Sequence, residues 1–183
     1  MDYTKIELFK EKLKNDLKPQ RYEHTLSTVK KAMELSVDTD ADKEKVFIAA
    51  LLHDCAKYKV PDENQKKELM DFLDCEAIIH APFGAIIAKE EYGITDETIL
   101  NAIKYHTTGR REMSIEEIIV CLADAIEDLR DYPNLNNIKK ATEKGLKNGL
   151  LVCLQGVVKY ETEKGNKIHH LTLEAIEWLK ESV

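Results

Sequence analysis

The 183-residue chain contains few of the residues that interrupt regular structure, with only seven glycines and four prolines. This scarcity excludes a collagen-like or low-complexity protein and favours helices joined by short loops. No apolar run approaches the roughly 20 residues that a membrane-spanning helix needs. The first residues also lack the apolar core of a signal peptide. We therefore expect a cytoplasmic protein that has no membrane as its partner.

The chain also lacks any Cys-X-X-Cys pair. Its four cysteines, Cys55, Cys75, Cys121 and Cys153, are far apart and mostly have apolar neighbours. Such spacing provides neither a zinc knuckle nor the disulfide framework of a small secreted domain. We expect reduced thiols in the core of the protein.

Basic residues are also fewer than acidic ones. The chain has 27 Lys and Arg and 34 Asp and Glu, which gives a net charge of -7. This balance argues against a nucleic-acid polymer or an anionic membrane as the main partner. A small phosphorylated molecule remains compatible, because it needs only a local cationic pocket.

What the chain has in abundance is helical periodicity and helix-capping residues. One expected helix follows cap candidates at residues 39–42, is apolar nearly all round over residues 46–52 and ends in a His-Asp doublet. The other expected helices span residues 4–17, 19–37, 61–73, 82–93, 95–109, 115–130, 136–145, 147–163 and 172–181. His169 and His170 fall in the loop before the last helix and are expected at the surface. The pattern predicts one all-α domain over residues 1–183.

The His53-Asp54 doublet stands at the end of the most apolar helix, and Lys57 follows about one turn later. Ionisable groups in such a place must be paired or bound to a metal, because burying an uncompensated charge is costly. A neutral core histidine beside a capping aspartate is one interpretation. The other is a metal site, since imidazole and carboxylate groups are good ligands for divalent first-row metals.

His24 lies in the helix expected over residues 19–37, nearly opposite the stripe that should face the core. The expected core stripe consists of Tyr22, Leu26, Val29 and Met33. Periodicity alone makes His24 a solvated residue. The alternative is that its face borders a polar cleft, into which Arg21, one turn earlier, would also point and meet an anion.

Asp124 lies between two alanines in the apolar helix opened by the capping box Ser114-Ile115-Glu116-Glu117. An aspartate buried in a helix needs a partner. A nearby arginine is one candidate partner, but a metal fits better because His24 and the doublet are ligand-type residues. Glu127 and Arg130 are expected one and two turns further along nearly the same face.

His80 and His106 are two further histidines with two interpretations each. His80 precedes Pro82 at an expected helix start, where a histidine caps the helix or binds a phosphate attracted by the free N–H groups. His106 ends an apolar stripe, as a core histidine would, but hydroxyl and guanidinium groups follow it. These following residues are Thr107, Thr108, Arg110 and Arg111.

In this order and these contexts, His24, His53-Asp54, His80, His106 and Asp124 resemble the HD-domain metal-dependent phosphohydrolases. Finer motifs are similar to the YqeK family, whose members split diadenosine tetraphosphate symmetrically into two ADP. The motifs are Arg21-X-X-His24, His53-Asp54-X-Ala56-Lys57, His80-Ala81-Pro82-X-Gly84-Ala85, His106-Thr107-Thr108-Gly109 and Ala123-Asp124-X-Ile126-Glu127-X-X-Arg130. The chain departs from the family where Pro-Gly usually separates the glutamate and the arginine, because it has Asp128-Leu129 there.

The resemblance implies an HD-domain-like helical globule with a metal-centred cleft lined by about five helices. It also implies a divalent transition metal in this cleft, most readily iron, with manganese, cobalt or zinc as alternatives. The expected ligands are His24, His53, Asp54 and Asp124, and a second ion held by Asp54, His80 and His106 is an alternative to phosphate contacts by the two histidines. The residues expected to act in catalysis are Asp54, Lys57, His80 and His106. The residues expected to bind substrate are Arg21, Lys57, His80, His106, Thr107, Thr108, Glu127 and Arg130.

The expected function is therefore metal-dependent hydrolysis of dinucleoside polyphosphates, with a small nucleotide as partner. Alternatives are a nucleoside mono- or triphosphate phosphohydrolase or a cyclic-nucleotide phosphodiesterase on the same scaffold. A non-catalytic nucleotide- or metal-sensing module is a further alternative, against which Lys57 argues because a sensor need not keep a cation beside the metal. A homodimer is an alternative to a monomer.

Overall fold

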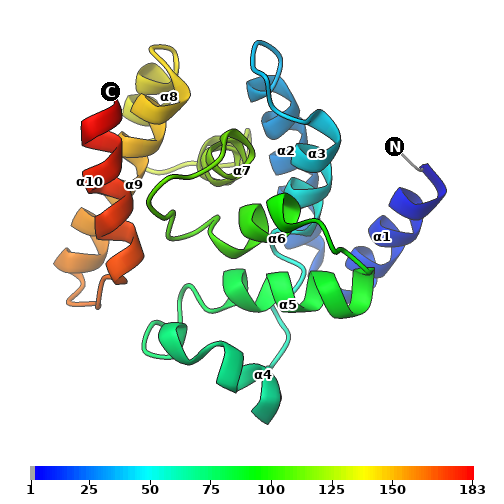
Figure 1. Cartoon of the computed structure of the whole chain (residues 1–183). Helices are drawn as coiled ribbons and strands as arrows, with labels where there is room; N and C mark the ends of the chain where they lie inside the picture. The colour runs from blue at the N-terminus through cyan, green and yellow to red at the C-terminus, as the bar shows by residue number, and fades with distance from the viewer. Residues whose placement is uncertain (1–2) are drawn as a thin grey trace.

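The computed structural model describes residues 3–183, and within this part it contains ten α-helices, one short 3-10 helix and no strand (Figure 1). The prediction of an all-α fold is confirmed. The α-helices are α1 (Tyr3–Asp16), α2 (Pro19–Leu35), α3 (Lys43–Leu52), α4 (Glu63–Glu68), α5 (His80–Tyr92), α6 (Glu97–Lys104), α7 (Ile115–Ile126), α8 (Leu135–Thr142), α9 (Leu146–Glu163) and α10 (His170–Ser182). The 3-10 helix η1 (Met70–Phe72) follows α4.

Several helix starts follow from local capping chemistry. The carboxylate of Asp42 accepts hydrogen bonds from the first N–H groups of α3. Ser114 and Glu117 form the expected capping box of α7. Pro19 occupies the first position of α2, where its missing N–H leaves no helical bond unmade.

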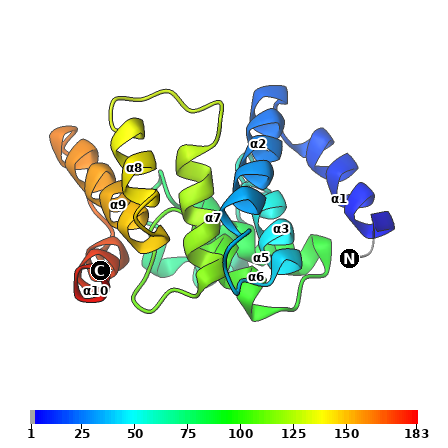
Figure 2. The same ribbon diagram turned by 90° about the horizontal axis from the view of Figure 1, so that it is seen from above.

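Helix α7 lies in the middle of the molecule, between α8 and α9 on one side and α2 and α3 on the other (Figure 2). Its residues Ile119, Val120, Leu122 and Ala123 are fully buried. Burying a large aliphatic side chain contributes about 1.5–3 kcal/mol. Asp124 is on α7, so its side chain is positioned by a firmly packed helix.

The face that α2 buries differs from the predicted stripe. Its buried residues are His24, Thr25, Thr28, Val29 and Ala32. Of the predicted stripe, Val29 is buried and Tyr22 and Met33 pack against the core, but Leu26 is 39% exposed. The buried face also takes in small and polar side chains because α2 packs against both α3 and α7. His24 is thus a buried residue, not a solvated one.

Three predicted helices end at least four residues earlier in the structure than in the sequence pattern. The helix expected over 61–73 ends at Glu68 and continues as η1 and turns, the one over 95–109 ends at Lys104, and the one over 115–130 ends at Ile126. In the last case, the side chain of Glu127 accepts a hydrogen bond from the N–H of Leu129 at 2.6 Å. This local bond offers the backbone an alternative to another helical turn.

Two expectations about burial differ from the structure, one for a histidine expected at the surface and one for a cysteine expected in the core. His169 is buried, caps α10 and stacks on Phe72 with ring centroids 4.7 Å apart, so its expected surface position was wrong. His170 is exposed as expected. All four cysteines are free thiols and three are buried, but Cys75 is only partly buried.

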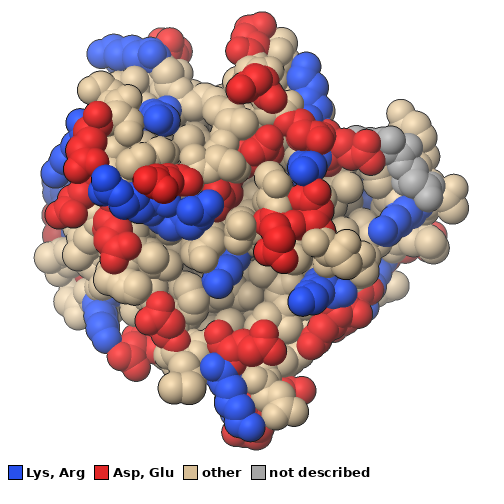
Figure 3. All heavy atoms as spheres, viewed as in Figure 1, with Lys and Arg blue, Asp and Glu red and all other residues tan. Residues whose placement is uncertain are grey.

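The surface drawn in Figure 3 carries acidic and basic side chains interspersed over the same face. None of the helices in the described part is long and apolar enough to cross a membrane.

Candidate metal centre

The doublet lies directly after α3, where His53 forms the C-terminal cap of the helix. Both residues are buried, with His53 0% and Asp54 2% exposed. Helix α5 packs close to this point because Gly84 has no side chain. A Cβ at that position would lie 3.3 Å from the carbonyl oxygen of His53. The apolar run of α3 thus delivers two ionisable side chains into the interior, as the sequence predicted.

Two buried imidazoles are oriented by backbone carbonyls one turn earlier. The Nδ1 atom of His53 lies 2.7 Å from the carbonyl oxygen of Ala50. The Nδ1 atom of His106 lies 2.7 Å from the carbonyl oxygen of Ile103. Since a carbonyl oxygen only accepts hydrogen bonds, the proton of each neutral ring lies on Nδ1 and Nε2 carries a free lone pair.

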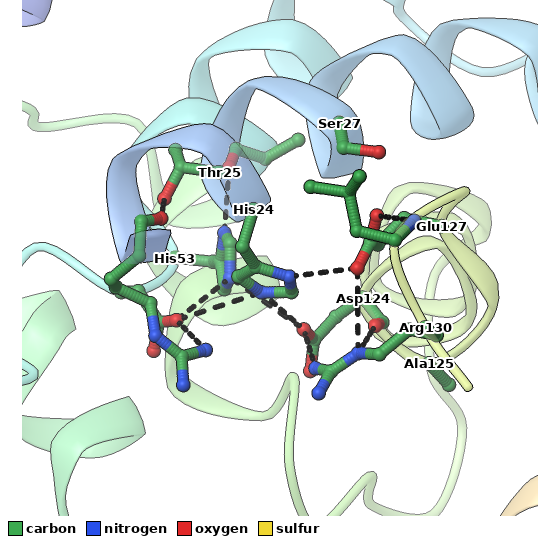
Figure 4. Close-up of polar contacts among 12 residues, drawn as sticks. His24, Thr25, Ser27, His53, Asp124, Ala125, Glu127 and Arg130 are labelled. Atoms are coloured by element: carbon green, nitrogen blue, oxygen red, sulfur yellow. Dashed lines mark hydrogen bonds and ion pairs between the residues drawn. The ribbon is translucent and has the colours of Figure 1, made fainter. Parts of the chain in front are cut away.

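His24 is oriented in the same way by a carboxylate, as Figure 4 shows. Its Nδ1 atom lies 3.1 Å from Oε1 of the buried Glu127. Burial raises the pKa of Glu127, but hydrogen bonds from Ser27, the N–H of Leu129 and His24 together lower it below its usual value. Glu127 therefore contacts His24 on the side away from the carboxylates, and it also lines the pocket beside the cluster.

The Nε2 atoms of His24 and His53 face the carboxylates of Asp54 and Asp124. His24 Nε2 lies 2.9 Å from Asp124 Oδ1, and His53 Nε2 lies 3.2 Å from Asp54 Oδ2. The two crossed distances, His24 Nε2 to Asp54 Oδ2 and His53 Nε2 to Asp124 Oδ1, are both 3.8 Å. Four residues from α2, the end of α3 and α7 thus converge on one point.

These converging atoms fit a metal ion. Within residues 3–183, the Nε2 atoms of His24 and His53 and Oδ1 of Asp54 are buried without a hydrogen-bond partner. Buried polar atoms are nearly always satisfied, and a set of lone pairs facing one another is satisfied by a cation. Ligand atoms within 4.8 Å of one another form two groups, His24 with His53 and Asp124, and His53 with Asp54 and His106.

The electrostatics of the cluster also favour positive charge. Burial raises the pKa of Asp54, but the neighbouring histidines, His53 foremost, bring it well below its usual value. Burial likewise opposes ionisation of Asp124, yet His24, His53 and Arg130 lower its pKa. Burial lowers the pKa of His53, and the two carboxylates outweigh this and raise it. The two carboxylates are therefore charged and attract a cation.

Two arginines contact the carboxylates from outside the cluster. Arg21 Nη1 donates to Asp54 Oδ2 at 2.9 Å. Arg130 Nη2 donates to Asp124 Oδ1 at 2.6 Å, and its Nε donates to the Asp124 carbonyl oxygen at 2.8 Å (Figure 4). Both guanidinium groups are partly exposed, so they present positive charge at the mouth of the cluster.

Lys57 and His80 form a third contact with the doublet. Lys57 Nζ lies 3.0 Å from His80 Nε2 and 3.9 Å from Asp54 Oδ1, and His80 Nε2 lies 3.3 Å from Asp54 Oδ1. Burial lowers the pKa of Lys57. Burial and the adjacent His106 lower the pKa of His80 to about 3, so its ring is neutral at pH 7.

Other residues expected at the site lie differently. Thr107 and Thr108 follow His106, and their hydroxyl oxygens are buried without hydrogen-bond partners among the described residues. Arg110 binds the buried Glu117 through two hydrogen bonds of 2.7 and 2.8 Å. Arg111 pairs with Glu181 of α10 at 2.8 Å. Arg110 and Arg111, which follow His106 in the sequence, therefore neutralise carboxylates of α7 and α10.

A pocket of about 420 Å³ opens beside the cluster. It is lined by Gln20, Arg21, Glu23, His24, Tyr58, Glu127, Leu129 and Arg130. The sequence did not predict a role in the pocket for Tyr58 or Leu129. Tyr58 lies beyond the end of α3, where periodicity gives no direction, and Leu129 was noted only as part of the Asp128-Leu129 departure from the family motif. The available signal for Tyr58 was its position next to Lys57.

Comparisons with known proteins agree with this geometry. The family model described as HD domain matches residues 21–129. A relative from Bacillus subtilis is 34% identical over 91% of this chain and 93% of its own, and one from Halalkalibacterium halodurans is 34% identical over 88% and 89%. Both relatives are named symmetrical bis(5'-nucleosyl)-tetraphosphatase.

A solved structure is similar over nearly the whole length. It is a crystal structure from Clostridium acetobutylicum, described as a predicted HD superfamily hydrolase involved in NAD metabolism. It is 34% identical, covers 97% of this chain and 98% of its own, and superposes with a TM-score of 0.89. The chain therefore belongs to the HD domain family, in the branch that contains these tetraphosphatase relatives.

Proposed function

We propose that this chain is a metal-dependent hydrolase that splits diadenosine tetraphosphate symmetrically into two ADP. Relatives that share 34–40% of their residues with it over most of the chain are named for this reaction. The site supports the same chemistry, because ligand-type side chains and cationic side chains lie within one cluster.

The observation that carries the proposal is the convergence of unpaired lone pairs. The Nδ1 atoms of His24, His53 and His106 are each held by an acceptor, which directs three Nε2 atoms toward Asp54 and Asp124. A purely structural cluster would interleave donors with acceptors. When the rings are neutral, their Nε2 atoms and the carboxylate oxygens are all acceptors, which is the arrangement that a divalent cation satisfies.

His24, His53, Asp54 and Asp124 would hold the metal. A bound divalent ion there supplies Lewis-acid chemistry toward a phosphate group and a water molecule. We propose iron, since imidazole nitrogen suits this metal and carboxylates complete the set, while manganese, cobalt and zinc fit the same donors.

The cationic side chains neutralise the charge of the bound phosphates. Arg21 and Arg130 are anchored by Asp54 and Asp124 and keep further N–H groups for phosphate oxygens. Lys57 lies beside the doublet and can stabilise the charge that develops on the departing diphosphate. Because ADP spreads its charge over two phosphates, its departure does not require a strong general acid.

Residues 1–183 act as a single domain in this proposal. Three clusters of buried apolar side chains are present in the described residues, and α7 contributes to each. Ile119 belongs to the largest cluster, Ile118 to the second and Leu122 to the third. One central helix therefore ties the metal centre to the C-terminal helices.

Product analysis tests the proposed function. Metal-loaded protein is incubated with diadenosine tetraphosphate, and the products of partial digestion are separated by ion-exchange chromatography. We expect two ADP per substrate and no ATP or AMP. Stoichiometric ATP and AMP would overturn the symmetrical reaction, and turnover equal to that of an Asp54→Ala variant would overturn hydrolysis at this site.

A further inference from the structure

The pocket beside the metal centre is lined by both polar and apolar side chains. Arg21, His24, Glu127 and Arg130 line the pocket and also belong to the hydrogen-bond network of the metal cluster. Phosphates would lie beside these residues. The volume of about 420 Å³ falls within the usual range for sites that hold small ligands, so there is room for more than the phosphates.

The pocket lining also includes two exposed apolar side chains. Tyr58, in the turn after α3, is 46% exposed, and Leu129, in the loop after α7, is 62% exposed. The two come from segments far apart in the sequence and line the same pocket. Apolar walls with a few polar groups between them are typical of binding sites for small organic molecules.

The Tyr58 ring is held in place from one side. The ammonium group of Lys18 lies 4.9 Å from the ring centroid, over one face, a distance within the range of a cation–π contact. Tyr58 is also exposed, so its ring is accessible to another flat group. Tyr58 also follows Lys57 directly, which ties the position of the ring to that of a cation beside the doublet.

The Leu129 side chain is fixed by the loop that bears it. Its N–H donates to Glu127 Oε2 at 2.6 Å. The neighbouring Asp128 pairs with Lys30 at 2.7 Å and Lys31 at 3.0 Å, both on α2. The loop is therefore pinned to the helix that carries His24, and an apolar side chain is kept at the pocket despite its exposure.

We propose that this pocket is the nucleoside subsite of the enzyme, in which a purine base stacks on Tyr58 and packs against Leu129. In this placement, the attached phosphates extend past Arg21 and Arg130 toward the metal cluster. This proposal rests on the proposed function only for the reaction that the enzyme catalyses. Binding in the subsite can be tested separately, because a nucleoside diphosphate can bind there without being cleaved. Gln20 and Glu23 at the rim supply polar groups for the edge of the base.

Calorimetric titration with two probes tests the subsite. ADP carries the base and inorganic pyrophosphate does not, and both are titrated into metal-loaded protein. Stacking on an aromatic ring contributes about 1–3 kcal/mol per base, so Tyr58→Ala should weaken ADP binding by roughly 5- to 150-fold. Leu129→Ser should weaken ADP binding in the same direction, and pyrophosphate affinity should stay unchanged in both variants.

Matched controls separate stacking from other effects. Tyr58→Phe keeps the ring and should retain the ADP affinity of the wild type. Tyr160→Ala removes an exposed tyrosine on α9, outside the pocket, and should leave both affinities unchanged. Thermal melts of every variant check that the fold is intact.

The outcomes distinguish this proposal from the proposed function. Unchanged ADP affinity in Tyr58→Ala and Leu129→Ser, or equal losses for ADP and pyrophosphate, would overturn the subsite. That result leaves symmetrical cleavage standing if the products are two ADP. Conversely, selective loss of ADP binding together with ATP and AMP as products would support the subsite and overturn the symmetrical reaction.

Discussion

His80 and His106 are both buried near Asp54, but their ring nitrogens meet different partners. His106 is held through Nδ1 by a carbonyl oxygen and groups with His53 and Asp54 as a candidate ligand set. His80 lies against the ammonium group of Lys57. A cation next to a ring nitrogen opposes metal binding there, so we expect the two histidines to have different roles.

Alanine variants of these histidines should therefore behave differently. His106→Ala should lose about one metal ion per chain if a second ion is bound by Asp54, while His80→Ala should keep the metal content and lose turnover. Elemental analysis of the purified proteins, combined with kcat and KM, checks this. Loss of a metal ion in His80→Ala would contradict the assignment of His80 to phosphate contact.

Lys57 is assigned to charge neutralisation at the departing diphosphate and not to the choice of the attacked phosphorus. Lys57→Ala should lower kcat by about 100- to 1,000-fold, the usual range for removing one stabilising group, with two ADP as the only products. Product chromatography at matched extents of reaction measures both effects. A shift to ATP and AMP in this variant would show that Lys57 positions the substrate.

The sequence could predict which residues form the metal cluster. His24, His53, Asp54 and Asp124 meet as the pattern indicated, because each is a costly residue to bury unless it has a partner. The position of Arg110 was not predictable, since its partner Glu117 is buried only once α7 has packed. Arg110 is therefore close to His106 in the sequence, but its side chain does not join His106 in the cleft.

Among the elements, the loop after α7 decides the shape of the substrate pocket. Asp128 connects this loop to α2 through Lys30 and Lys31. These lysines lower the pKa of Asp128 to about 2, Lys30 contributing most. An unfolded aspartate titrates near 3.9, so the stabilisation by this pair is present above about pH 4 and is lost as the pH falls toward 2.

Asp128→Asn should thus lower the free energy of unfolding near neutral pH by at most about 1 kcal/mol, because the group is exposed and screened by solvent. The difference from the wild type should shrink as the pH falls from about 4 toward 2. Urea denaturation of the metal-free proteins across this range measures it. A difference that stays constant with pH would show that the carboxylate charge does not hold the loop.

Helix starts followed the sequence more closely than helix ends did. Asp42 and Ser114 cap their helices with their own side chains, which is a local signal. At the end of α7, the Glu127 side chain bonds both the N–H of Leu129 and His24, a residue 103 positions away in the chain. The hydrophobic periodicity of the sequence cannot predict such a tertiary contact. It cannot predict the burial of the polar face of α2 either.

At the scale of the whole molecule, the candidate ligands link helices that are distant in sequence. His24 is on α2, His53 and Asp54 follow α3, and Asp124 is on α7. A metal that binds only the folded chain stabilises it by about 4 kcal/mol when its concentration is 1,000 times the dissociation constant.

Removing the metal should therefore lower the melting temperature of the wild type by roughly 8–16 °C, given about 2–4 °C per kcal/mol for a chain of this size. Differential scanning calorimetry with and without a chelator measures the shift. Asp54→Ala, which lacks one ligand, should show little response to the chelator. An equal shift in that variant would place the stabilising metal elsewhere.

An anomalous difference map, recorded at the iron absorption edge from crystals of active protein purified without oxygen, tests the metal centre most directly. We expect a peak about 2.0–2.2 Å from the Nε2 atoms of His24 and His53 and from carboxylate oxygens of Asp54 and Asp124, the usual range of metal–ligand distances. Active crystals with no metal at this cluster, or with metal only at the separate group Asp71, His169 and His170, would contradict it.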